Sequence, residues 1–106
     1  MCDIVVISKQ SPGGRCQLYM RYGEALGSRL GCYSAVRADR AGTPVAAPAL
    51  LVDGEAVVPA DGRILAPEDI AGHLQRQGFG DAEVAAIAKL LQEILDRWRD
   101  EWGGGS

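Results

Sequence analysis

The sequence lacks the features of a membrane-spanning or secreted chain. No stretch approaches the roughly 18 consecutive apolar residues that a transmembrane helix requires. The N-terminus has no basic segment followed by a long apolar run, which is the pattern of a secretory signal. Its 3 cysteines are an odd number, which argues against the closed disulfide framework of small secreted proteins. We therefore expect a cytoplasmic protein with no membrane partner.

An excess of basic residues is also missing. The chain has 11 lysines and arginines against 14 aspartates and glutamates, and its net charge is -3 at pH 7. Nucleic-acid binders usually carry a basic excess, because the neutralisation of phosphates supplies much of their affinity. We therefore expect no nucleic-acid partner.

Common catalytic and ligand-binding patterns are absent as well. No serine or cysteine can be placed beside the single histidine, His73, so we interpret it as a surface residue. Zinc ligands usually come in pairs at short spacing, and Cys2, Cys16 and Cys32 are not paired in this way. The turn Gly13-Gly14 lacks the Lys-Ser/Thr element of a phosphate-binding loop. The sequence therefore predicts no cofactor and no metal.

What is present is the composition of one small folded domain. The 106 residues are 47% hydrophobic and 24% charged, which is enough to fill a modest core. Residues 3–8 contain the run Ile-Val-Val-Ile, which is typical of a strand buried on both faces. Residues 15–30 have helical periodicity, with small residues Gly23 and Gly27 on the apolar side. A second strand over 32–36 then completes a parallel strand–helix–strand unit.

The second half of the chain predicts a hairpin and then two helices. Residues 49–52 form a short apolar run, and Asp53-Gly54 after it is a strong hairpin signal, with 55–58 as the returning strand. Pro67 is well suited to the first position of a helix. Asp81 caps a last, long helix. The expected order is therefore β-α-β-β-β-α followed by an added helix.

The segment 47–58, Ala-Pro-Ala-Leu-Leu-Val-Asp-Gly-Glu-Ala-Val-Val, resembles the second half of small thioredoxin and glutaredoxin relatives. Those proteins carry a proline before a buried strand, then a turn with glycine, a strand, and a helix with acidic residues near its start. Gly62 and residues 67–70 resemble these later elements. In that family the proline is cis and faces the active site, and the resemblance implies the same for Pro48.

The resemblance implies an α/β fold of the thioredoxin-like superfamily. It covers about half of the chain. The implied organisation is a thioredoxin-like domain over 1–80, an added C-terminal helix over 81–102, and a Gly/Ser tail over 103–106.

The chain departs from this family at the redox motif. The family places Cys-x-x-Cys between the first strand and the first helix, where this chain reads Gly13-Gly14-Arg15-Cys16. The second cysteine is present, and the first, which attacks the substrate in that family, is replaced by Gly13. We therefore favour a binding or accessory module that acts through protein–protein contact, and we do not expect an enzyme.

Two thiol-based functions remain as alternatives. Cys16 follows a Gly-Gly turn at the start of a helix, where backbone amides and Arg15 favour a thiolate. This arrangement suits a monothiol oxidoreductase, although Cys16 is equally placed to be a buried residue on the inward face of the helix. The other alternative is a metal- or metalloid-binding protein that uses the cysteines. Cys2 precedes the first strand and Cys32 opens the second, so we expect that pairing of these strands as parallel neighbours can bring the two thiols within several ångströms of each other.

The last helix carries a heptad-like apolar seam with spacings of four and three residues. Tryptophan can bury a large area and often anchors interfaces. We therefore predict a homodimer or a protein partner held by this helix, with packing onto the chain's own sheet as the alternative. The predicted interface residues are Leu91, Leu95, Trp98 and Trp102.

Overall fold

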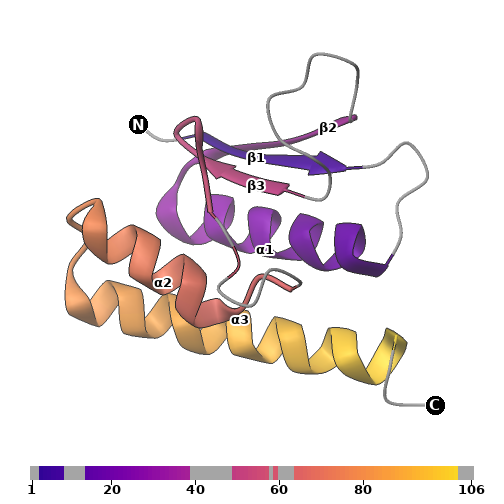
Figure 1. Ribbon diagram of the computed structural model, residues 1–106. Helices are drawn as coiled ribbons and strands as arrows, with labels where there is room; N and C mark the ends of the chain where they lie inside the picture. The colour runs from indigo at the N-terminus through magenta and orange to yellow at the C-terminus, as the bar shows by residue number, and fades with distance from the viewer. Residues whose placement is uncertain (1–2, 9–13, 39–48, 58, 60–63, 103–106) are drawn as a thin grey trace. The chain divides into compact units, whose positions relative to one another are not determined.

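The chain folds into a mixed α/β structure with a four-stranded sheet and three helices in its described part (Figure 1). This computed structural model describes residues 3–8, 14–38, 49–57, 59 and 64–102. Within those ranges, the side chains of Arg15, Ala38 and Trp102 are not described. The chain divides into two compact units, Met1–Val57 and Val58–Ser106. The boundary after residue 80 that the sequence suggests stays a prediction.

The first unit contains the sheet and one helix. The sheet consists of β1 (Asp3–Ser8), β2 (Tyr33–Ala38), β3 (Ala49–Val52) and β4 (Glu55–Ala56), in the spatial order β2-β1-β3-β4. β2 runs parallel to β1, whereas β3 and β4 are each antiparallel to the preceding strand in that order. Helix α1 (Gly14–Leu30) connects β1 to β2 and lies against the sheet (Figure 1). The predicted parallel strand–helix–strand unit is therefore confirmed.

Small residues allow α1 to lie close to the sheet. A Cβ atom placed on Gly23 would lie 2.7 Å from Cγ2 of Val6 in β1. One turn later, a Cβ on Gly27 would lie 2.9 Å from Cβ of Ser34 in β2. Both distances are too short for a normal contact between carbon atoms, so the helix can approach this closely only where it has glycine. Ile4 and Leu50 complete the buried layer beneath Gly23.

The hairpin between β3 and β4 forms at the predicted turn. Asp53 and Gly54 both have positive φ, at 52° and 83°, as a two-residue turn with the twist of the flanking strands requires. Register places Leu51 opposite Ala56 and Val52 opposite Glu55. β4 ends at Ala56, two residues earlier than the predicted strand, although the backbone N–H of Val57 still donates to the carbonyl of Leu50.

The second unit contains helices α2 (Pro67–Arg76) and α3 (Asp81–Trp102), which pack against each other. Pro67 occupies the predicted first position of α2. The preceding residue, Ala66, has no polar side chain to cap the helix. Its backbone N–H instead donates to Oδ2 of Asp69 at 2.9 Å, which ties the first turn to the entering chain. The apolar stripes of the two helices supply the buried residues Ile70, Leu74, Val84, Ile87, Leu91 and Leu95.

Candidate functional site

The thiol of Cys16 is buried. Cys16 lies near the start of α1, is 2% exposed, and takes part in no disulfide. It belongs to the same helical stripe as Gly23, which faces the sheet. A thiol must meet its substrate to react, so in this conformation Cys16 is placed as a core residue and not as a surface nucleophile.

The other members of the predicted redox site are only partly described. Gly14 is the first residue of α1 and is half-buried, and Arg15 is described through its backbone alone. Gly13 and Pro48 lie outside the described residues. The proximity of Cys16 to Pro48 therefore stays a prediction, as does the cis peptide bond before Pro48.

Cys32 is disulfide-bonded, in contrast to Cys16. It immediately precedes β2 and is half-buried. The parallel register pairs Asp3 with Tyr33, the residue that follows Cys32. The remaining cysteine of the sequence, Cys2, lies outside the described residues.

His73 corrects the sequence interpretation, because it is not a surface residue. It is only 6% exposed, and its Nε2 atom has no hydrogen-bond partner among the residues that the structure describes. Oε1 of Gln77, the residue that directly follows α2, likewise has no partner within the described part of the chain. His73 lies three residues after the buried Ile70 and beside the buried Leu74, so the helical periodicity places it at the margin of the apolar stripe. That spacing was the signal in the sequence that the interpretation overlooked.

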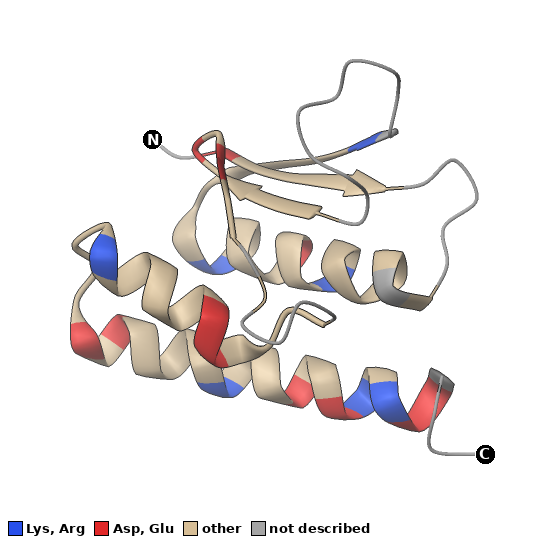
Figure 2. Ribbon diagram, in the orientation of Figure 1, with Lys and Arg blue, Asp and Glu red and all other residues tan. Residues whose placement is uncertain are grey.

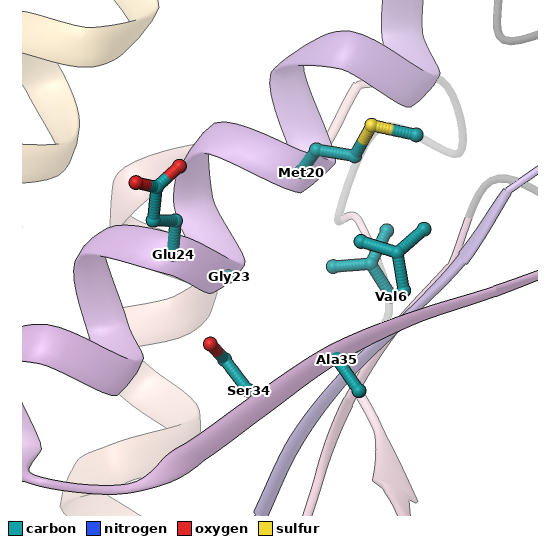
Figure 3. Close-up of a pocket in the computed structure, with 7 residues that line it drawn as sticks. Val6, Met20, Gly23, Glu24, Ser34 and Ala35 are labelled. Carbon is teal, nitrogen blue, oxygen red and sulfur yellow. The ribbon is translucent and has the colours of Figure 1, made fainter.

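A groove runs between α1 and β2 in the first unit. Its volume is about 390 Å³, which lies in the range of small-ligand pockets. Glu24 and Ser34 stand at one end, and Met20 and Val6 stand at the other (Figure 3). Gly23 lies between Met20 and Glu24 on the helix and is also part of the lining. Ala35 and Val36 complete the described lining.

The strand beside this groove carries exposed apolar side chains. Tyr33 is 69% exposed and Val36 is 52% exposed, and they are the large hydrophobic residues that the described surface leaves open to solvent. Both lie on β2, at the edge of the sheet. The sequence alone does not single out these residues, because a strand's place at an edge depends on which strands pair.

The predicted interface on α3 divides into buried and accessible residues. Leu91 and Leu95 are buried within the single chain, and Trp98 is half-buried. The side chain of Trp102 is not described. The polar side of α3 carries charges of both signs along its length (Figure 2). The interface of these residues with a partner or a second copy stays a prediction.

In the described ranges, no three His, Cys, Asp or Glu side chains lie close enough together to hold a metal ion. None of the described helices combines the length and apolar character that crossing a bilayer demands.

No protein-family model, curated protein or solved structure matches the chain.

Proposed function

We propose that this chain is a protein-binding module on a thioredoxin-like scaffold, which acts through protein–protein contact and not through dithiol chemistry. The strand order β2-β1-β3-β4 supports the scaffold part of the proposal, together with the parallel β1–β2 pair and the antiparallel β3 and β4. In this proposal α2 corresponds to the helix that follows the hairpin in the thioredoxin-like order of elements, and α3 is an additional C-terminal helix.

One contrast carries the proposal. The thiol of Cys16 is buried, whereas Tyr33 and Val36 are exposed on an edge strand beside an open groove. Thiol exchange needs an accessible thiolate and a leaving sulfur, and Gly13 stands where the attacking cysteine of the family would be. Binding needs only an exposed apolar surface with hydrogen-bonding groups, which β2 has.

The remaining parts of the proposal concern location and partners. We propose that the protein is cytoplasmic. Disulfides such as that of Cys32 are uncommon in the cytoplasm. The oxidation state of Cys32 in protein isolated from cells therefore tests the proposed location. Trp98 and Trp102 are the residues of α3 through which a second copy or a partner protein would be held.

The test is a selection of random linear peptides, displayed on phage, against the intact chain and against Cys16→Ala. A binding module enriches the same peptides with both proteins, because the thiol plays no part. Enrichment that disappears with Cys16→Ala, while circular dichroism shows that the fold is kept, would instead support the monothiol oxidoreductase. Absence of enrichment with both proteins would contradict a peptide-binding function.

A further inference from the structure

β2 presents an open hydrogen-bonding edge. In the described part of the sheet β2 pairs with β1 alone, and its six residues are all in register with β1. Backbone N–H and C=O groups on the outer side of an edge strand are available to pair with another strand. The opposite edge is far less suited to this, because β4 has only 2 residues and one of them is the exposed Glu55.

Side chains on one face of β2 reach the groove. Ser34 lies beneath Gly27 of α1, and Val36 is paired with Val6, which lies beneath Gly23. Alternation along a strand therefore places Ser34 and Val36 on the α1 side, and Arg37 on the other side. A strand added to β2 would likewise send every second side chain toward α1 and into the groove.

The groove has an apolar end and an acidic end. Met20, Val6 and Val36 form the apolar end, whereas Glu24 is the one charged residue in the described lining. Glu24 is exposed on α1, and its carboxylate points away from Ser34 in Figure 3. The lining therefore has hydrocarbon at one end and the exposed Glu24 at the other, with no described basic group in the lining to balance its charge.

We propose that β2 and the adjoining groove bind an extended peptide segment of a partner protein, with the sequence pattern aliphatic-x-basic. The segment lies antiparallel to β2 as a fifth strand, since antiparallel pairing is slightly more stable than parallel pairing. Its aliphatic side chain packs against Met20 and Val36, and its lysine or arginine lies beside Glu24. The aliphatic and basic residues of the peptide are two residues apart, because the residues of β2 that they would lie opposite, Val36 and Ser34, are also two residues apart.

This inference rests on the proposed function and names its partner. It is tested by the same peptide selection, carried out with the wild-type chain, with Glu24→Lys, and with the control Glu93→Lys. Glu93 is an exposed glutamate of α3, so the control makes the same change of charge away from the groove. Wild type and control should enrich aliphatic-x-basic peptides, whereas Glu24→Lys should enrich peptides with an acidic residue at the basic position.

The affinity of one selected peptide gives a second measurement. Glu24→Lys should weaken its binding about fivefold to tenfold, because attraction to a partly exposed carboxylate becomes repulsion. Val36→Lys should weaken binding of the peptide by a similar factor, because the charged ammonium group of the lysine would then stand where the aliphatic side chain of the peptide packs. In ¹⁵N spectra the peptide should shift the amide signals of 33–38 and 20–24, and circular dichroism should show that all variants keep their helices.

The outcomes separate this inference from the proposed function. Peptides that bind with equal affinity to Glu24→Lys and wild type, and that shift the amides of α3 instead, would overturn the groove as the site while leaving a binding module. A chain that sediments as a dimer and becomes a monomer with Val36→Lys would show a second copy on β2, which also overturns the inference. Failure of every variant to enrich any peptide would overturn both.

Discussion

Asp53 and Asp3 are joined by two hydrogen bonds, although 50 residues separate them in the sequence. Oδ1 of Asp53 accepts a bond of 2.8 Å from the backbone N–H of Asp3, and the backbone N–H of Asp53 donates one of 2.8 Å to the carbonyl of Asp3. Asp53 also occupies the left-handed position of the hairpin turn, with φ 52°. One residue therefore shapes the β3–β4 turn and fixes the start of β1 against it.

We predict that Asp53→Ala lowers the free energy of unfolding by about 1–2 kcal/mol. The change removes a hydrogen bond to a carboxylate and replaces aspartate, whose short polar side chain tolerates the left-handed region, with alanine, which rarely adopts it. Asp53→Asn should cost less, since asparagine tolerates the conformation and keeps an acceptor. Urea denaturation measures both, with Glu55→Ala as the exposed neighbouring control. Equal effects of Asp53→Ala and Glu55→Ala would show that the bond to Asp3 adds nothing.

Alanine at the two glycines Gly23 and Gly72 should have opposite effects. A Cβ on Gly23 would lie 2.7 Å from Val6, a stiff β-branched residue of β1, so Gly23→Ala should destabilise by about 1–3 kcal/mol. The nearest atom to a Cβ on Gly72 is the far end of Arg76 at 3.6 Å, so Gly72→Ala should stabilise by about 0.5–1 kcal/mol through helix propensity. Thermal unfolding compares the two directly. Stabilisation by Gly23→Ala would mean that α1 is not held against the sheet as described.

The buried thiol of Cys16 should resist alkylation in the folded protein. Iodoacetamide at neutral pH is expected to modify it much more slowly than free cysteine, and at the ordinary rate once urea unfolds the chain. The chain should also fail to catalyse reduction of the disulfides of insulin. Mass spectrometry counts the modified thiols, and unfolded protein serves as the reference. Fast alkylation of the native chain would place Cys16 at the surface and favour thiol chemistry.

The disulfide of Cys32 should have Cys2 as its partner, since Cys16 takes part in none. Digestion without reductant should therefore release a peptide pair that joins Cys32 to Cys2. Reduction, or Cys32→Ser, should lower the free energy of unfolding by about 2–4 kcal/mol, which is the typical contribution of a disulfide. Cys16→Ser is the control that leaves the disulfide in place. A linkage between Cys32 and Cys16 would contradict this prediction.

Substitution of Leu91 should affect the stability of the fold, whereas substitution of Trp98 should affect the oligomeric state. Leu91 is buried within the chain, so Leu91→Ala should lower stability by about 2–5 kcal/mol whatever the oligomeric state. Trp98 is half-buried near the end of α3, so Trp98→Ala combined with Trp102→Ala should keep the fold and convert a dimer to a monomer. Sedimentation and circular dichroism measure the two effects. A wild-type chain that is monomeric at tens of micromolar would refute self-association through the tryptophans.

The local structure of this protein was determined by short stretches of sequence. The β-branched run of residues 3–8 predicts β1, and the structure confirms its bounds. Asp53-Gly54 predicts the hairpin because the turn needs positive φ at both positions, and Pro67 predicts the start of α2 because its ring presets a helical φ. Each of these features depends on the conformational preferences of a few adjacent residues, which the sequence contains in full.

The burial of His73, the length of β2 and the groove beside it were decided by the tertiary structure. β2 runs on to Ala38, beyond the predicted strand 32–36, because β1 offers a pairing partner along its whole length. Val36 and Glu24 line one groove because α1 crosses back over the sheet to connect two parallel strands. Strand order and helix placement arise from contacts between segments far apart in the chain, so no local pattern contains them, and the surface proposed for binding exists only once those contacts form.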